Sequence, residues 1–426
     1  MLRLTEIKLP LNHPPEAIAT AAIARLHIEP GDLISCAVFR RAHDARKKSN
    51  IFLIYSLDVE VKHEAEVLER INKANVKGQG LVLPTPDIEY RYVAHAPENF
   101  NKRPIVIGAG PCGLFAALIL AQMGFRPIIL DRGKVVRERT KDTWRLWRHS
   151  ELNPESNVQY GEGGAGTFSD GKLYSQIKDP RHLGRKVLTE FVKAEAPPEI
   201  LTEAHPHIGT FRLVKMVENM RATIESLGGE YRFQSRVTDL DIESSSDGTR
   251  QLRGVVLASG ERIAADHVVL AIGHSSRDTF EMLHDKGVYV EAKPFSVGFR
   301  IEHPQSLIDV ARFGTFAGDP NLGAADYKLV HHAGNGRDVY SFCMCPGGTV
   351  VAAASETGRV VTNGMSQYSR AERNANAGIV VGITPDDYPD GPLAGIEFQR
   401  KWEAAAFVAG GGTYAAPAQR VGDFIA

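Results

Sequence analysis

The sequence predicts a mixed α/β fold in three parts, and three patterns indicate them. A short β-prone run at residues 104–107 leads into a glycine-rich turn and then a helix. Before it, residues 1–80 alternate strand-like and helix-like stretches. After it, residues 291–426 consist mainly of short β-prone pieces. The chain of 426 residues has room for roughly three domains of about 150 residues each.

The first part has the pattern of a small α+β unit. Strand-like alternation and helix-opening prolines give the order β-α-β-β-α. The expected elements are strands at residues 2–11, 33–39 and 51–61 and helices at residues 14–26 and 63–74. This order suits a ferredoxin-like domain over residues 1–80. The proline-containing stretch from Val76 onward has the composition of a linker, and we place the linker at residues 81–103.

Charge and cysteine content exclude several classes of protein. A basic stretch from Arg40 to Lys48 has no interleaved aromatic side chains, so we expect a solvated hairpin loop rather than a nucleic-acid site. The chain holds 50 Lys and Arg against 51 Asp and Glu, so no bulk positive field gathers nucleic acid or an anionic membrane. Four cysteines are too few for a disulfide scaffold, and they suggest reduced thiols in the cytoplasm.

One uncharged stretch, residues 105–125, deserves a test as a membrane span. About 20 apolar residues can cross a bilayer. However, glycines and a proline near the start of this stretch would interrupt a continuous helix. We therefore expect a buried strand, turn and helix there, and no membrane span. The N-terminus interleaves charged and apolar residues and cannot form the core of a signal peptide.

The strongest local motif is Gly108-x-Gly110-x-x-Gly113, with a strand before it and a small-residue helix after it. Gly108 allows a tight turn, Gly110 lets a diphosphate approach the backbone, and Gly113 allows close packing of helix and strand. Exposed N–H groups and the helix dipole then attract the diphosphate. Pro111 fits the first turn because its missing N–H is not needed there. The motif predicts a Rossmann-like dinucleotide-binding domain over residues 104–290.

An acidic residue ends the next expected strand, which runs from Pro127 to Leu130. Asp131 lies about twenty residues past the fingerprint, where a carboxylate can accept hydrogen bonds from the ribose hydroxyls of an adenosine. A 2′-phosphate would meet its negative charge, although Arg132 alongside could reduce the repulsion. The pattern favours FAD or NAD over NADP. The alternative is a glycine-rich turn that binds nothing.

A second glycine run, Gly161 to Gly166, has the same spacing but follows no convincing strand and leads into no helix. A second Rossmann start is not expected there. The pattern fits a mobile loop that closes over a cofactor, or a plain surface loop. Further helices are expected at residues 181–194 and 212–227, and further strands at 230–237, 252–257, 268–272, 296–301, 327–331, 339–345 and 349–354.

These residues resemble a bacterial family of largely uncharacterised FAD-dependent dehydrogenases, whose nucleotide domain is similar to that of the glutathione-reductase superfamily. The segments that carry the resemblance are 108–113, 130–139, 150–173, 342–348 and 415–424. A ferredoxin-like N-terminal unit also occurs in this family, so the resemblance covers nearly the whole chain. It implies FAD rather than NAD at the fingerprint. It also implies that residues 291–426 form a β-rich substrate or cap domain.

The resemblance further implies which residues surround FAD. The glycine loop would cover the cofactor, the backbone near the start of a later strand would touch the adenine, and another glycine would pass close to the nucleotide. These residues are Gly163, Gly164, Gly166, Thr167, Val237 and Gly273. The usual C-terminal Gly-Asp or Gly-Glu-Gly type segment has no copy before Ala426, so the resemblance predicts a last domain that is incomplete at its C-terminus.

The implied function is that of a dehydrogenase that acts on an unidentified small molecule by hydride transfer through the flavin, with NAD(P)H as a candidate electron donor. The alternative is a non-catalytic protein that holds FAD or NAD as a structural or sensory ligand. No catalytic residue is assigned, and the sequence carries no signature of the oligomeric state.

Several other side chains could carry chemistry, but structural roles are expected for them. Cys343 and Cys345 would share one face of a strand, as buried thiols rather than a redox pair or a zinc site. Cys112 is expected to be a spacer inside the fingerprint. The loop 205–212 holds two His and an Arg that could recognise a carboxylate, although turn-capping and solvated roles fit it better. His274 follows Gly273 but is not expected to be catalytic.

Overall fold

The computed structural model describes residues 1–74, 80–175 and 177–426, and the chain forms two compact units. The first unit comprises Met1–Arg91, Lys172–Ile208 and Pro304–Asp326. The second unit comprises Tyr92–Gly171, Gly209–His303 and Tyr327–Ala426. The start of the predicted linker, residues 76–79, lies outside the described residues.

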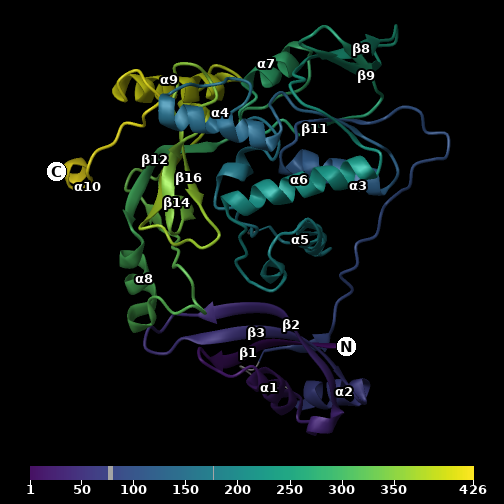
Figure 1. Ribbon diagram of the computed structural model, residues 1–426, viewed down its shortest axis with the longest axis vertical. Coiled ribbons are helices and arrows are strands. Elements are labelled where there is room, and N and C mark those ends of the chain that lie inside the picture. The colour runs from purple at the N-terminus through teal and green to yellow at the C-terminus, as the bar shows by residue number, and fades with distance from the viewer. Residues whose placement is uncertain (75–79, 176) are drawn as a thin grey trace. The chain divides into compact units, whose positions relative to one another are not determined.

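The first unit contains a four-stranded antiparallel sheet in the order β2-β3-β1-β4. Apolar residues on β1 and β3, such as Leu4, Leu57 and Val59, are fully buried against the helices. Figure 1 shows α1 and α2 on one face of this sheet. Its elements are β1 (Leu2–Pro10), α1 (Glu16–Leu26), β2 (Leu33–Asp44), β3 (Phe52–Val61), α2 (Glu64–Ala74) and β4 (Val82–Pro84).

Two details of the first unit differ from the sequence prediction. The basic stretch is only partly a loop, because β2 continues through Arg40 to Asp44 and pairs with Ser56 to Phe52 of β3. Exposed positions on a strand accept basic side chains as readily as a loop does. The predicted linker contains β4, which pairs with the start of β1. A strand of three residues that ends in proline carries too little alternation to be recognised.

Two later segments also belong to the first unit. One carries α5 (Leu183–Lys193), which falls within the predicted helix at 181–194. The other carries α8 (Gln305–Phe313), whose last residue is buried in the same core as β1 and β3. The core of this unit is therefore built from two stretches that are far apart in the sequence, residues 2–82 and 308–325.

The second unit contains a parallel sheet in the order β11-β5-β6-β7. Its strands are β5 (Ile105–Ile107), β6 (Ile128–Leu130), β7 (Glu230–Arg232) and β11 (Val268–Leu270). Helix α3 (Pro111–Gln122) connects β5 to β6, and α6 (Thr210–Ser226) precedes β7. Figure 1 shows α3 beside α6. Parallel strands joined through helices, with the fingerprint after β5, make this a Rossmann-like α/β fold, as the sequence predicts.

A three-stranded antiparallel sheet follows, formed by β8 (Val237–Ser244), β9 (Arg250–Leu257) and β10 (Arg262–Ala264), with α7 (Arg277–Asp285) after β11. The predicted strand at 230–237 is therefore two strands. The break has a local cause, because Gln234 has a φ of +54°, which lies outside the range of a regular strand.

The last part of the second unit is rich in strands. One sheet has the order β12-β17-β14-β13, and β15 and β16 form a separate hairpin. The sequence predicts neither β17 nor the long helix α9. The elements are β12 (Phe295–Pro304), β13 (Val330–His332), β14 (Asp338–Cys345), β15 (Gly348–Ala352), β16 (Thr362–Ser366), β17 (Asn374–Ile383), α9 (Ala394–Ala409) and α10 (Val421–Ile425).

The uncharged stretch at 105–125 folds as β5, the turn and α3, which is only 12 residues long. Across the described parts of the chain, the search for a helix with the length and hydrophobicity of a membrane span finds none.

Candidate nucleotide site

The turn after β5 needs two of its glycines for steric reasons. Gly108 has a φ of +102°, and a Cβ there would lie 2.3 Å from the carbonyl oxygen of Ala271. A Cβ on Gly113 would lie 1.8 Å from the carbonyl oxygen of Gly108. Gly110 differs, because a Cβ there meets only the Cα of Gly164, at an ordinary contact distance of 3.6 Å. The middle glycine is therefore not explained by the packing of the protein itself.

The start of α3 is open. Pro111 is its first residue, and both Pro111 and Cys112 are exposed. Among the described residues, the N–H groups of Cys112 and Gly113 donate to no protein acceptor, and no side chain caps the helix. No acidic residue lies in the first turn. The positive end of the helix dipole thus faces a place where an anionic group can bind.

Asp131 lies directly beneath this turn, at the end of β6. Its Oδ2 accepts the N–H of Ala109 at 2.7 Å, and its Oδ1 accepts the N–H of Gly133 at 2.8 Å. The side chain is almost completely buried. Burial raises the pKa of Asp131, while the two N–H groups act in the opposite direction. Each carboxylate oxygen has a second lone pair, so the group can still accept ribose hydroxyls.

Asp131 therefore also has a structural role, as the acceptor for two backbone N–H groups. Replacing it by alanine would leave the buried N–H groups of Ala109 and Gly133 without an acceptor. Each such loss costs about 1–3 kcal/mol. Loss of nucleotide binding in that variant would therefore be mixed with loss of stability.

Arg132 already binds other side chains of the protein. Its guanidinium binds Glu155 at 3.0 Å and Asp278 at 3.1 Å, and it lies over the ring of Tyr160. Burial alone would lower the pKa of Arg132, but its hydrogen bonds to Asp278 outweigh this and raise it. The side chain is thus neutralised and held in place. It is not free to reduce the repulsion between Asp131 and a 2′-phosphate, which supports FAD or NAD over NADP.

The second glycine run packs against the fingerprint. Gly163 donates its N–H to the carbonyl of Ala109 at 2.8 Å, and a Cβ on Gly164 would lie 2.8 Å from the Cα of Gly110. Gly161 to Gly164 and Thr167 are buried, so the plain surface loop considered from the sequence is wrong. We call residues 161–168 the glycine loop. Gly166 lies beside Pro111, with 3.7 Å from its Cβ position to the proline ring.

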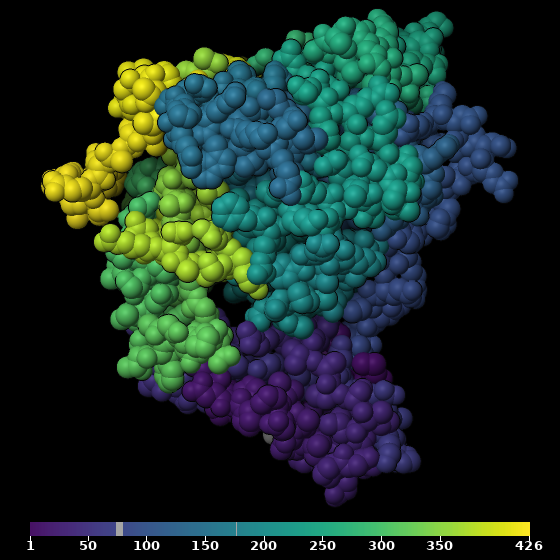
Figure 2. Space-filling model, viewed as in Figure 1, coloured from purple at the N-terminus to yellow at the C-terminus, as the bar shows by residue number. Residues whose placement is uncertain are grey.

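Sequence reasoning missed the residue that organises this loop. Arg139 lies on α4 (Val136–His149), which is at the surface in Figure 2, in blue. Its side chain points inward and is completely buried. The guanidinium donates to four carbonyls of the loop and of the residues before it, those of Asn157 and Val158 at 2.7 Å, Glu162 at 2.7 Å and Gly161 at 3.4 Å. Burial lowers the pKa of Arg139 to about 10, so it stays charged at neutral pH.

Glu162 ties the glycine loop to two helices. Its Oε2 accepts the N–H of Val136, the first residue of α4, at 2.7 Å. Its Oε1 accepts Nε of Arg221 on α6, also at 2.7 Å. The residue is completely buried. A carboxylate at a helix start is favoured by the dipole, so Glu162 and Arg139 together fix both sides of the loop.

The remaining predicted cofactor residues are Val237 at the start of β8 and Gly273 after β11. Val237 is buried at the start of β8, and Ser235 just before it donates its N–H to the carbonyl of Asp131 at 2.9 Å. Gly273 follows β11 with a φ of +70° and is exposed, and open space surrounds its Cβ position. His274 is exposed as well. In the part of the chain that the structure describes, neither residue forms a backbone hydrogen bond with the fingerprint.

The other candidate side chains do not form a second catalytic cluster. A bulge lies between Phe342 and Cys345, and Cys343 has a φ of +45°, so the regular alternation expected for the two cysteines is broken. In the first unit, His205 stacks on Tyr174. In the second, Arg212 lies over the ring of Tyr368. The described residues contain no group of three or more His, Cys, Asp or Glu side chains that could hold a metal ion.

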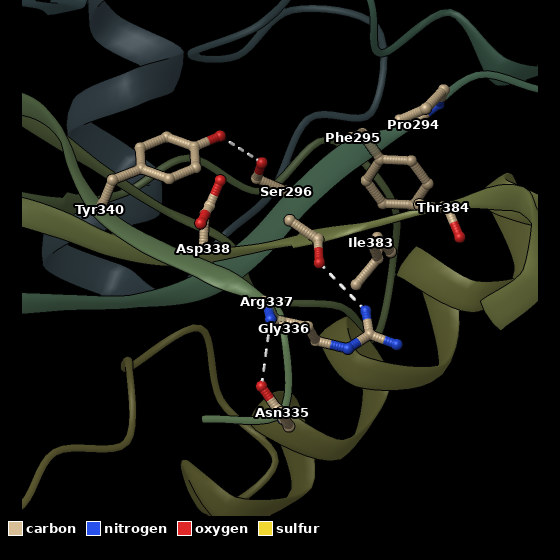
Figure 3. Close-up of a pocket in the computed structure, with 11 residues that line it drawn as sticks. Pro294, Phe295, Ser296, Asn335, Gly336, Arg337, Asp338, Tyr340, Ile383 and Thr384 are labelled. Atoms are coloured by element: carbon tan, nitrogen blue, oxygen red, sulfur yellow. Dashed lines mark hydrogen bonds between the residues drawn. The ribbon is translucent and has the colours of Figure 1, made fainter. Parts of the chain in front are cut away.

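A separate open pocket of about 580 Å³ lies at one end of the sheet formed by β12, β14 and β17. Figure 3 shows the hydroxyls of Ser296 and Tyr340 bonded to each other, and Arg337 donating to the carbonyl of Gly382. Arg337 also forms a two-pronged ion pair with Asp387, at 2.6 and 3.0 Å. The volume is in the range of small-molecule sites, but its one guanidinium is already neutralised.

Three models of protein families match the chain. Residues 102–287 match the model described as pyridine nucleotide-disulphide oxidoreductase, and residues 294–426 match the model described as FAD-dependent protein, C-terminal domain-like. Residues 1–60 match a domain of unknown function. An uncharacterised protein of Clostridium beijerinckii is 44% identical over all 426 residues, which span 77% of its length.

Solved structures show a more distant likeness. THI4 of Thermovibrio ammonificans is 18% identical, over 44% of this chain and 64% of that chain, with a TM-score of 0.31. The halogenase PltM, solved with FAD and phloroglucinol, is 12% identical, over 71% of this chain and 56% of that chain, with a TM-score of 0.34. The chain thus spans less than two thirds of the length of either solved protein.

Proposed function

The chain belongs to the same family as the uncharacterised Clostridium beijerinckii protein and carries FAD-dependent oxidoreductase domains, and on that premise we propose that it is a dehydrogenase that acts on a small molecule by hydride transfer through FAD. One observation carries this proposal. The start of α3 is exposed, a buried glycine loop packs against the turn before it, and a carboxylate lies at the end of the adjacent strand, β6.

The residues of this site fit FAD. The unpartnered N–H groups of Cys112 and Gly113 would hold the diphosphate, and the bare backbone of Gly110 would let it approach. The free lone pairs of Asp131 would accept the ribose hydroxyls, and the backbone before Val237 would lie along the adenine. When bound, FAD supplies the hydride chemistry. The protein then has to bind FAD and the substrate, orient them and exclude water.

The glycine loop supports a role in covering the cofactor. It is anchored by Arg139 and Glu162 and lies against Gly110, so its position is fixed by buried hydrogen bonds. We propose that Gly163, Gly164, Gly166 and Thr167 line the bound FAD. Gly273, at the end of the neighbouring strand, would border the nucleotide from the other side.

We further propose that residues 1–80 are a ferredoxin-like domain and that residues 291–426 shape the substrate site. The β-α-β-β-α-β order and the antiparallel sheet support the first assignment. The strand-rich sheets after Pro294 and the pocket beside them support the second. NAD(P)H is the proposed electron donor: it passes a hydride to FAD and leaves as NAD(P)⁺, and the small-molecule substrate then takes the hydride from the reduced flavin. NAD(P)H would react from solution, because the sequence has no second fingerprint in the context of a strand and a helix.

The colour of the purified protein tests the function. We expect a yellow protein whose visible flavin absorption is bleached by NADH or NADPH without oxygen and returns in air. Mass spectrometry of the released ligand should identify FAD. A yellow protein that no physiological donor reduces would favour a structural or sensory role. A colourless protein that takes up NAD would contradict the proposal.

A further inference from the structure

A guanidinium without a carboxylate partner lies on β12 of the second unit. Arg300 donates from Nε to Oδ1 of Asn376 on β17 at 2.8 Å. It donates from Nη2 to the carbonyl of Cys343 on β14 at 2.9 Å, and the same nitrogen lies 3.8 Å from Sγ of Cys345. Within the described parts of the chain, no Asp or Glu forms an ion pair with it. These contacts orient the guanidinium but leave its charge uncompensated.

The surrounding backbone is shaped around this side chain. The positive φ of Cys343 and the bulge beside it turn the Cys343 carbonyl toward Arg300. Such a conformation costs about 1–3 kcal/mol and persists where surrounding contacts enforce it. On β16, a Cβ at Gly364 would lie 2.4 Å from Nη2 of Arg300 and 2.7 Å from Sγ of Cys345. The bulge and the glycine both make room for a fixed guanidinium.

One nitrogen of Arg300 remains available. Nη1 donates to no protein acceptor among the described residues, and it is not one of the buried unpartnered atoms, so it is in contact with solvent. Arginine has only donors, so Asn376 must turn its oxygen toward Nε, which leaves Nδ2 of this fully buried residue unpartnered. Donors without acceptors therefore accumulate around a single positive charge.

Two more polar residues lie near this charge. Nε2 of His303 is hydrogen-bonded to the hydroxyl of Tyr327 at 2.9 Å, and Nδ1 of His303 is buried without a partner. Burial raises the pKa of Tyr327, and the charge of Arg300 acts against that rise. The atoms that Arg300 contacts directly are an amide oxygen, a carbonyl oxygen and a sulfur, so the ligand that this guanidinium suits carries a negative charge and acceptor atoms.

Arg300 and the residues that hold it, Asn376, Cys343 and Cys345, form what we call the Arg300 cluster. This cluster is linked to the glycine loop through β16. Asn363 donates from Nδ2 to the carbonyl of Phe168, the last residue of the glycine loop, at 3.2 Å. Its neighbour Gly364 is the residue that makes room for Arg300. Successive residues on a strand point to opposite faces, so Asn363 faces the glycine loop and Gly364 faces the Arg300 cluster. The glycine loop and the Arg300 cluster therefore lie on opposite faces of β16.

We propose that Arg300 binds the carboxylate group of a small-molecule ligand. A planar guanidinium matches the geometry of a carboxylate, and one unneutralised cation matches its single charge. This inference rests on the proposed function, because it makes the ligand the carboxylate-bearing substrate of the flavin reaction. The proposal gives the substrate a chemical class that neither the family models nor the fingerprint supplies.

Isothermal titration calorimetry of the FAD-loaded protein with sodium benzoate, at constant ionic strength, tests the site. We expect benzoate to bind at least tenfold more tightly than neutral benzamide, about 1.4 kcal/mol. Arg300→Met keeps most of the aliphatic chain and removes the charge, and it should weaken benzoate binding at least tenfold. Arg253→Met is the matched control, because that arginine lies on β9 of the same unit, does not line the pocket and is neutralised by Glu243. It should bind benzoate like the wild type.

Several outcomes would overturn the proposal. They are a wild type that does not bind benzoate, an Arg300→Met protein that binds it unchanged, and a site that binds inorganic phosphate more tightly than benzoate. If Arg300→Met does not fold, Arg300→Lys keeps a charge but cannot reproduce the fork, and unchanged affinity there contradicts the proposal. Protein without flavin absorption would contradict the proposed function. FAD-loaded protein that ignores benzoate contradicts this inference alone.

Discussion

The three glycines of the fingerprint differ in what a methyl group would meet. At Gly113 it would collide with the carbonyl of Gly108 at 1.8 Å, which is a backbone atom that cannot move aside. At Gly110 it would lie at a normal distance from Gly164. Packing therefore requires a glycine at position 113, whereas a glycine at 110 is required only if something else approaches the backbone there.

This difference makes Gly110→Ala a selective test. We expect the variant to fold like the wild type and to bind FAD at least tenfold more weakly, about 1.4 kcal/mol, because the methyl group narrows the space for the diphosphate. Circular dichroism reports the fold, and equilibrium dialysis with FAD reports the affinity. Gly113→Ala should instead lose folded protein. Retention of FAD at wild-type affinity by Gly110→Ala would show that no diphosphate approaches this backbone.

Site residues that belong to a local motif could be predicted from the sequence, and contacts with distant partners could not. Gly108 and Asp131 belong to a motif in which spacing alone sets the role, so the sequence predicted their places. That Asp131 also accepts the N–H groups of Ala109 and Gly133 was not visible, because backbone donors leave no mark in a sequence. The partners of Arg132 could not be predicted either, because Glu155 and Asp278 lie 23 and 146 residues away in the sequence.

At the scale of elements, the glycine loop depends on α4 rather than on its own sequence. Its glycines allow the loop to bend, and Arg139 determines where the bend lies by holding four carbonyls. No motif connects an arginine in an amphipathic helix to carbonyls about twenty residues later. The same limit explains why β4 and the bulge at Cys343 were missed, because each depends on pairing with a strand that is distant in the sequence.

Arg139→Lys should therefore destabilise the loop and weaken FAD binding together. A lysine has one ammonium group and cannot reach all four carbonyls, so at least one buried acceptor would be left without a donor, at a cost of about 1–3 kcal/mol. Urea unfolding measures the loss of stability, and retained flavin absorption measures the loss of cofactor. Arg137→Lys, on the exposed side of the same helix, is the control and should cost less than about 1 kcal/mol. Equal effects of the two changes would contradict the anchoring role.

At the scale of the whole molecule, the chain divides its sequence unevenly between two units. The segments Lys172–Ile208 and Pro304–Asp326 leave the second unit and complete the first. Composition and periodicity cannot predict such an exchange, because each segment looks like an ordinary helix or loop. The fingerprint, Asp131, the glycine loop and Arg139 all belong to the second unit. The whole nucleotide site is therefore built within one unit.

This division predicts where FAD acts on stability. A ligand that binds only the folded state stabilises it, by about 2.7 kcal/mol at a hundred times its dissociation constant. Hydrogen exchange should therefore show that adding FAD to the cofactor-free protein slows the amides of β5, the turn after it and residues 161–168. The amides that pair β1 with β3 in the first unit should exchange at the same rate with and without FAD. Gly110→Ala should remove most of the protection at the same FAD concentration. Equal protection of both units, or protection confined to the first, would place the cofactor away from the fingerprint, because a ligand held by Gly110 and Asp131 acts first on the hydrogen bonds around them.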